Sequence, residues 1–175
     1  MLSNEPIKEI DVLLATTFFL VQRGVTPYQF SIAHGKEINY QEHLEKVLQP
    51  FRAIGREPII STTGPDIMGL SENEWWQIEC KSSGSGKKQT QRNNFDRALA
   101  SIVSYYEEDL SNLEIPEEFK DTKPYLGLAL PATPEYLTEL KRRVRKPLRT
   151  RLNLWILLYD PDTKLIRPIS PIEDY

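Results

Sequence analysis

A predicted β-hairpin over residues 65–81 constrains the fold of this 175-residue chain more than any other feature. Its first arm begins with a proline followed by Asp66, and its second arm ends in Glu79, Cys80 and Lys81. Pairing the two ends of the Ser-Glu-Asn-Glu turn sets the register and places Asp66 opposite Glu79, where Cβ atoms lie about 4.5–5.5 Å apart. Because side chains alternate along a strand, Glu79 and Lys81 share one face and Cys80 points away from it.

This register predicts two facing carboxylates with an ammonium group beside them. Like charges directly opposed destabilise a sheet, so the pair favours a cation between Asp66 and Glu79. Carboxylate oxygens suit Mg²⁺, with Mn²⁺ as a substitute. The alternative is a turn aspartate followed by the solvated face of a surface hairpin. Two tryptophans, an isoleucine and the cysteine make the second arm apolar, which instead favours an interior strand.

The composition limits the class of protein to which this chain can belong. The net charge is −3, with 39% apolar and 27% charged residues, which is ordinary for one globular domain over 1–175. The single cysteine excludes an internal disulfide and suits a reducing compartment. The longest apolar run, 12–21, is too short to span a bilayer and lacks the flanks of a signal peptide. We therefore expect a cytoplasmic protein without a membrane partner.

The pattern along the chain predicts an α/β fold with a central mixed sheet of four to five strands flanked by helices. A loop carrying Pro27 and Gly35 is expected after the first helix, a Gly/Ser/Lys loop over 82–88, and an acidic loop over 111–123. The predicted helices cover 7–22, 40–51, 95–107 and 135–146, and the predicted strands cover 58–62, the two hairpin arms, 125–131, 152–159 and the edge segment 164–169.

The Pro-Asp pair, the twelve-residue spacer and Glu-Cys-Lys resemble the motif of the PD-(D/E)XK nuclease superfamily, which has the restriction-endonuclease-like fold. The resemblance implies a helix, a three-stranded meander carrying the motif, and then alternating helices and strands. It covers about 39–159. The N-terminal helix 7–22 is expected as an extra element, and 160–175 as a C-terminal tail.

The resemblance also implies roles for the motif residues. Asp66 and Glu79 would bind Mg²⁺, with the backbone carbonyl of Cys80 as a further ligand. Lys81 would orient or deprotonate the attacking water, or contact the phosphate in the transition state.

Two further polar residues are candidates by resemblance. Members often add a glutamate from the preceding helix, for which we choose Glu45; Glu42 competes but suits a capping role. Some branches use a glutamine at the start of the next helix, here Gln91. It is followed by Phe95, where those branches usually carry tyrosine.

Nucleic-acid contacts are predicted from local charge. Arg142, Arg143 and Arg145 belong to a run of seven cations in eleven residues, typical of a phosphate-tracking surface or of a solvated helix face. Lys87 and Lys88 end a glycine-rich loop that lacks the spacing of a P-loop. This loop either touches a DNA backbone or is simply flexible.

Together these features predict a metal-dependent DNA endonuclease that hydrolyses phosphodiester bonds at Asp66, Glu79 and Lys81. A homodimer through helix 7–22 and a DNA-recognition partner protein are compatible with it. Two alternatives stay open. The chain is a non-catalytic or partner-dependent module of the same fold, binding DNA or protein, or an unrelated α/β protein whose two acids point to different faces.

Overall fold

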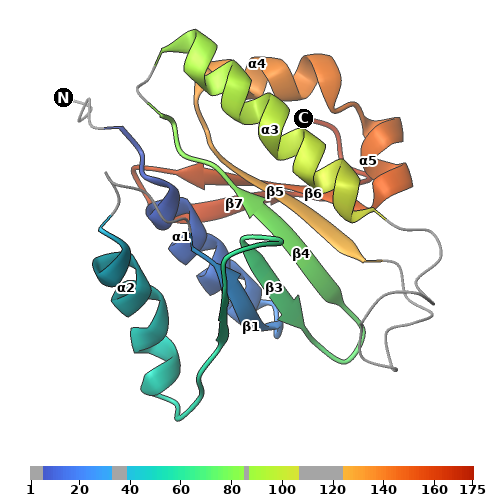
Figure 1. Ribbon diagram of the computed structural model, residues 1–175. Helices are drawn as coiled ribbons and strands as arrows, with labels where there is room; N and C mark the ends of the chain where they lie inside the picture. Colours follow the sequence, from blue (N-terminus) through green and yellow to red (C-terminus); the bar gives the residue numbers. More distant parts are fainter. Residues whose placement is uncertain (1–5, 33–38, 85–86, 107–123) are drawn as a thin grey trace.

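Seven strands form one mixed sheet in the order β2-β1-β3-β4-β5-β6-β7, with β4 at its centre (Figure 1). The computed structural model describes residues 6–32, 39–84, 87–106 and 124–175. The predicted acidic loop lies outside these residues. The strands are β1 (Thr26–Ser31), β2 (Ile59–Ser61), β3 (Ile67–Leu70), β4 (Trp75–Cys80), β5 (Tyr125–Pro131), β6 (Leu154–Asp160) and β7 (Leu165–Ile169). The helices are α1 (Glu9–Gln22), α2 (Tyr40–Arg52), α3 (Lys88–Tyr105), α4 (Pro134–Arg143) and α5 (Lys146–Leu152).

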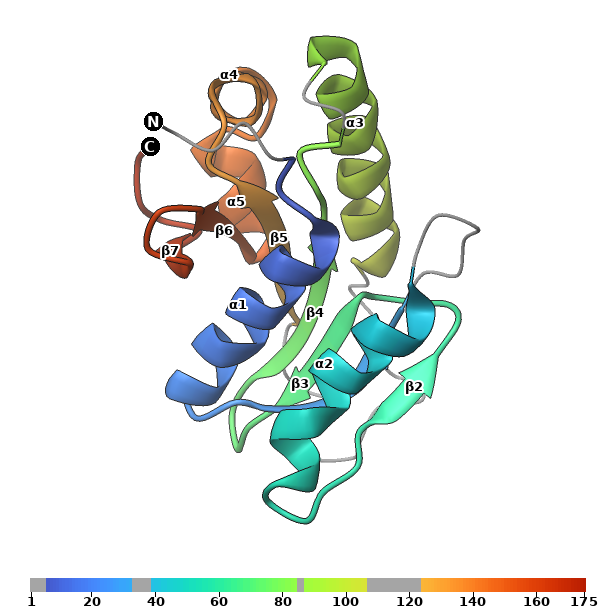
Figure 2. The same ribbon diagram turned by 90° about the vertical axis from the view of Figure 1, so that its left-hand side faces the viewer.

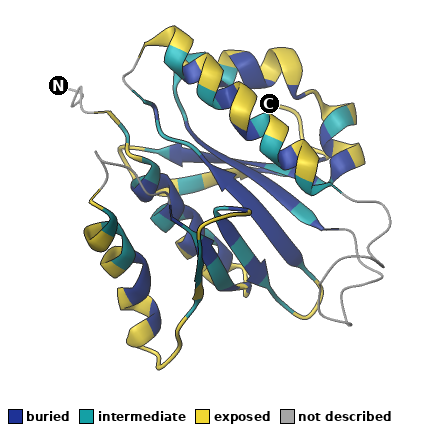
Figure 3. Ribbon diagram, viewed as in Figure 1, coloured by how far each residue is buried: buried dark blue, intermediate teal, exposed yellow. Residues whose placement is uncertain are grey.

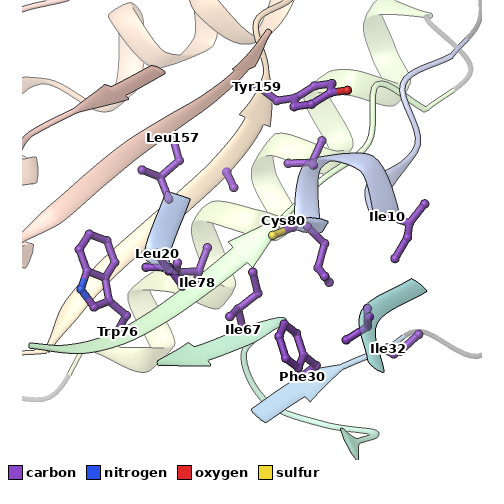
Figure 4. Close-up of a cluster of buried hydrophobic side chains, with 14 of the residues drawn as sticks. Ile10, Leu20, Phe30, Ile32, Ile67, Trp76, Ile78, Cys80, Leu157 and Tyr159 are labelled. Carbon is purple, nitrogen blue, oxygen red and sulfur yellow. The ribbon is translucent and has the colours of Figure 1, made fainter. Parts of the chain in front are cut away.

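Helices cover both faces of the sheet. Figure 2 shows α1 and α2 on one side, where Trp76, Ile78 and Cys80 of β4 pack against them (Figure 4). On the opposite side, α3, α4 and α5 pack against alternate residues of β5 and β6. Every residue of β4 is buried as a result (Figure 3). Polar side chains on β4 therefore need partners inside the protein.

The predicted hairpin is confirmed, including its register. β3 pairs antiparallel with β4, and Ile67 faces Ile78. The amide of Ser71 donates to the carbonyl of Glu74 over 2.9 Å and closes the turn. The same alignment continued by one residue sets Asp66 opposite Glu79.

The strand β1 replaces the loop that was expected around Pro27. Its buried Phe30 packs edge-on against Phe51 of α2, at 5.5 Å between ring centroids. Pro27 has no amide hydrogen to donate, and the β1–β3 register shifts between Pro27 and Gln29. The predicted loop was wrong because a proline is tolerated in a strand at such an irregularity.

This strand changes the layout of the expected core. β1, β3 and β4 form the antiparallel meander, whereas β2 pairs only with β1, in parallel, at the edge of the sheet. The helix before the meander is therefore α1, and α2 with β2 lies between β1 and β3 along the chain. The N-terminal helix, expected as an extra element, packs into the hydrophobic core, where Val12 and Leu20 of α1 are fully buried.

Two helix predictions need correction. α3 begins at Lys88, seven residues earlier than expected. The helix expected over 135–146 ends at Arg143, and α5 begins at Lys146. Pro147 has no amide hydrogen to donate to the carbonyl of Arg143 four residues earlier, so one continuous helix is disfavoured, whereas a proline is tolerated in the first turn of a new helix. The edge strand β7 agrees with the prediction. Among the described residues, no helix has both the length and the apolar character needed to cross a membrane.

Candidate metal and nuclease site

Asp66 lies just before β3, where three strands come together. Its backbone carbonyl accepts a hydrogen bond from the amide of Ser31 in β1 (3.0 Å). Its carboxylate Oδ2 accepts one from the amide of Cys80 in β4 (2.6 Å). These two contacts fix both the backbone and the side chain of Asp66 beside the end of β4.

Lys81 places its ammonium group between the two predicted acids. Its Nζ donates to Oε1 of Glu79 (2.7 Å) and to the carbonyl of Cys80 (2.9 Å), and lies 3.8 Å from Oδ2 of Asp66. The Cys80 carbonyl, predicted as a metal ligand, thus binds the ammonium here. The cation expected between the two carboxylates is supplied by the chain itself.

Glu79 is held from the other side by α3. The hydroxyl of Tyr105 donates to Oε2 of Glu79 over 3.0 Å. Burial, followed by the charge of Glu79, raises the pKa of Tyr105, so this hydroxyl stays protonated and remains a donor. Both oxygens of a side chain that is only 9% exposed therefore have partners.

A third carboxylate, Glu9, belongs to the same electrostatic cluster. It lies in the first turn of α1, which is attached to the segment after β4: the amide of Ile7 donates to Oγ of Ser83 (2.8 Å), and the Ser83 amide donates to the Ile7 carbonyl (3.0 Å). Burial raises the pKa of Glu9; the charge of Lys81 lowers it and that of Glu79 raises it.

The cluster contains three acidic side chains and one basic side chain. Burial raises the pKa of Asp66 to about 8 against the opposing charge of Lys81, and Glu79 and Glu9 raise it further, so Asp66 is largely protonated at neutral pH without a bound cation. Burial favours the neutral amine of Lys81, but the three carboxylates outweigh this effect and raise its pKa. A bound cation would favour loss of the Asp66 proton; with all groups then ionised, three carboxylates face one ammonium, which leaves a net charge of −2.

This donor set fits a divalent cation. Mg²⁺ takes oxygen ligands and is commonly bound by one or two carboxylates with several waters, and a charge of +2 balances the cluster. The described residues contain no group of three or more His, Cys, Asp or Glu side chains already arranged around a metal position. Lys81 holds Glu79 and approaches Asp66, so its ammonium would have to withdraw before an ion could bind both.

A cleft of about 450 Å³ adjoins the cluster through Glu9. Its polar lining includes Ser31, Ser82 and Asn39, and its apolar lining includes Leu13 and Ile32. Apolar walls with a few polar groups are typical of ligand-binding clefts.

The other predicted site residues lie elsewhere. Glu45 is exposed on α2 and forms an ion pair with Arg52 (2.8 Å). Glu42 pairs with Lys46, and its amide donates to the capping side chain of Asn39, as its predicted capping role requires. The expectation that Glu45 joins the site was wrong, because Glu45 is held in this surface ion pair, whereas the helix glutamate that interacts with Lys81 and Glu79 is Glu9 of α1.

Gln91 lies in the first turns of α3 and accepts a hydrogen bond from the hydroxyl of Thr133 (2.6 Å), the residue that caps α4. About 20 Å of helix separates it from Tyr105, at 1.5 Å per residue. The hydrogen bond between Gln91 and Thr133 joins α3 to α4. The residue of α3 that reaches Glu79 is Tyr105.

The predicted DNA-binding residues lie on the α3–α4–α5 side. Lys87 precedes α3, and Lys88 lies 3.6 Å from Glu135 of α4. Arg142 and Arg143 end α4, and Arg145 caps α5. Within the described residues, the acidic partners of Arg142 and Arg143 are on α4 and α3, and Lys146 of the same run pairs with Asp174 after β7.

Sequence reasoning missed Glu9 and Tyr105. A signal for Glu9 exists: it is one of two acids in the first turn of α1, the most apolar of the described helices, where a buried carboxylate is costly. Only the tertiary structure brings Tyr105 to Glu79. Comparisons with protein families, curated proteins and solved structures found no match to this chain.

Proposed function

We propose that the chain is a metal-dependent nuclease with a restriction-endonuclease-like core, which hydrolyses phosphodiester bonds in DNA. The observation that carries the proposal is the convergence of Asp66, Glu79 and Lys81 at the end of the central strand, with Glu9 beside them. The order α1, β1, β3, β4, α3, β5 also supports it, because it follows a helix, a three-stranded meander, a helix and a strand.

The acidic side chains would hold the ion, and the hydrogen bonds around them serve this role. Asp66, Glu79 and Glu9 supply only oxygen donors, as Mg²⁺ prefers. Bound there, the ion would lower the pKa of a water molecule and offset the charge that develops on the phosphate. The Cys80 amide and the Tyr105 hydroxyl keep Asp66 and Glu79 oriented.

Lys81 would act on the reacting groups once released from Glu79. Its ammonium is a donor that either orients the attacking water or stabilises negative charge on the phosphate in the transition state. It stays protonated because three carboxylates raise its pKa. A protonated amine suits charge stabilisation better than proton abstraction, so we assign Lys81 to the transition-state phosphate.

Nicking of supercoiled plasmid DNA in Mg²⁺, Mn²⁺ or EDTA tests this function. We expect cleavage with either metal, none in EDTA, and loss of cleavage in Lys81→Ala. Lys46→Ala, which removes an exposed lysine from α2, is the matched control and should cleave normally.

Thermal unfolding of the same proteins separates metal binding from catalysis. Wild type and Lys81→Ala should both be stabilised by millimolar Mg²⁺. Stabilisation without cleavage of any DNA by the wild type would identify a non-catalytic or partner-dependent module. If the wild type is neither stabilised by metal nor able to cleave DNA, the proposal is overturned.

A further inference from the structure

Three arginines converge on one carboxylate where α3 meets α4. Glu139 of α4 accepts hydrogen bonds from Arg142 (2.5 Å) and Arg143 (3.5 Å), and its other oxygen lies 3.5 Å from Nε of Arg92 on α3. Arg143 also bonds to Asp96 of α3. We call Arg92, Arg142 and Arg143 the arginine seam.

The seam holds its guanidinium groups in place while leaving them accessible. The side chain of Glu139 is only 4% exposed, whereas those of Arg92 and Arg142 are 54% and 63% exposed. Hydrogen bonds from Arg142 are the main reason that the pKa of Glu139 is lowered, so this carboxylate stays ionised. Arg143 is more enclosed, with its guanidinium 5.2 Å from the centre of the Phe95 ring.

The donors of the seam exceed its acceptors. Each guanidinium carries five N–H donors, and three of them offer far more than the oxygens of Glu139 and Asp96 can accept. The charge is also unbalanced, with three cations facing two carboxylates. A further anion is therefore attracted to the exposed side of Arg92 and Arg142.

A tertiary hydrogen bond connects the helix that carries Glu139 to the segment next to the candidate site. Tyr136 of α4, three residues before Glu139, donates its hydroxyl to the carbonyl of Ser82 (2.6 Å), the residue after Lys81. One helical turn therefore connects the segment that carries the lysine to the carboxylate that gathers the arginines. Figure 1 shows α3 and α4 side by side on the same face of the sheet.

We propose that Arg92 and Arg142, oriented by Glu139, bind backbone phosphates of the DNA that extends away from the scissile bond. The inference rests on the proposed function for its ligand; it adds Arg92 to the predicted DNA contacts and Glu139 as the residue that positions the arginines. Planar guanidinium forks match phosphate oxygens in two hydrogen bonds, and arginines held in advance lose less freedom on binding. An exposed seam between two helices suits a polymer backbone, which needs no enclosed pocket.

Fluorescence anisotropy with a labelled DNA duplex in EDTA tests the seam apart from catalysis. All variants carry Lys81→Ala, so neither metal nor cleavage enters the measurement. The double variant Arg92→Ala/Arg142→Ala should bind the duplex more weakly. The negative slope of log K against log salt concentration should become shallower by about two, at about 0.9 for each phosphate contact that is lost. The matched control is Lys46→Ala/Arg52→Ala, which removes two paired cations from α2 and should keep the slope.

The variant Glu139→Gln gives a second test, because two explanations predict opposite changes in DNA affinity. Removing a negative charge should tighten DNA binding if only net charge matters, whereas loss of the orienting carboxylate should weaken it. We expect weaker binding; tighter binding would overturn the orienting role. Equal slopes for the two double variants would overturn the seam as a DNA contact. Plasmid cleavage by the wild type, measured separately, decides the nuclease proposal whichever result the seam gives.

Discussion

The ammonium of Lys81 lies 2.7 Å from the carboxylate of Glu79, two residues before it along the chain and on the same face of the sheet. This contact satisfies a buried acid with a cation from its own strand end. It also means that the protein without metal already has an internal counter-ion. Lys81 therefore serves stability and, in the proposed function, catalysis.

Lys81→Ala should destabilise the metal-free protein. The change leaves Glu79, Asp66 and Glu9 without their cation; breaking a fully buried pair costs about 3–5 kcal/mol, and we expect about 2 kcal/mol here because Lys81 keeps 16% of its side chain exposed. For a chain of this size, that lowers Tm by about 4–8 °C in EDTA. Millimolar Mg²⁺ should recover most of the loss, so Mg²⁺ should raise the Tm of the variant by more than that of the wild type. An equal rise in both proteins would contradict the counter-ion role.

Glu9→Gln and Glu45→Gln should differ in metal affinity. Both replace a helix glutamate by its neutral isostere, but Glu9 interacts with Lys81 and Glu79, whereas Glu45 pairs with Arg52 at the surface. We expect Glu9→Gln to weaken Mn²⁺ binding about tenfold, or about 1.4 kcal/mol, in calorimetric titrations. Glu45→Gln should match the wild type. If Glu45→Gln weakens Mn²⁺ binding and Glu9→Gln does not, the helix glutamate of the metal site comes from α2.

The hairpin could be predicted because its determinants are local. A four-residue turn sets the register, and strand alternation then assigns Asp66, Glu79 and Lys81 to one face. The position of Glu9 could not be predicted in this way. Its approach to Lys81 depends on the contact between Ile7 and Ser83, which are 76 residues apart.

One local error explains the wrong choice of helix glutamate. Pro27 was interpreted as a loop signal, so the meander was started at β2 and the preceding helix became α2. The break between α4 and α5 was predictable in principle, since Pro147 cannot donate a hydrogen bond inside a continuous helix but is tolerated in the first turn of a new one. The pairing of Arg142 with Glu139, three residues earlier on the same predicted helix, was also open to sequence reasoning. The pairing of Arg143 with Asp96 was not, because these residues are 47 apart in the sequence.

Stability should show an acid-sensitive contribution from Glu74. Its carboxylate accepts two hydrogen bonds from Arg23 (2.7 and 2.8 Å) and one from Trp76 (2.8 Å), which joins the end of α1 to the hairpin. Burial raises the pKa of Glu74, but these hydrogen bonds outweigh it and hold the pKa below 4.5. A lowered folded-state pKa stabilises the protein above the unfolded value, and this contribution is lost as the pH falls through the folded value.

Glu74→Gln should therefore lose about 1 kcal/mol at neutral pH, the scale of a partly exposed pair with charge-assisted hydrogen bonds. Urea unfolding at neutral pH and below pH 4.5 measures the difference from the wild type. We expect the two free energies of unfolding to converge in acid. A difference that is independent of pH would show that packing, and not ionisation of Glu74, accounts for the loss.

Tyr105→Phe isolates the hydrogen bond that orients Glu79. The hydroxyl lies 3.0 Å from Oε2, while Oε1 is bonded to Lys81, so its removal frees one side of the carboxylate. We expect a stability loss of about 1–2 kcal/mol, since the lost bond is to a charged acceptor. Groups that orient a metal-binding side chain typically change metal affinity about 10–100-fold when they are removed. Mn²⁺ should therefore bind more weakly, by at least about tenfold.

Tyr28→Phe is the matched control for this loss. Its hydroxyl accepts a hydrogen bond from the indole of Trp75 (3.2 Å), in a small apolar cluster apart from the acids. Both variants should unfold more easily than the wild type, but only Tyr105→Phe should lose Mn²⁺ affinity. If the two proteins bind Mn²⁺ equally, Tyr105 acts in packing alone, and the orientation of Glu79 must come from Lys81.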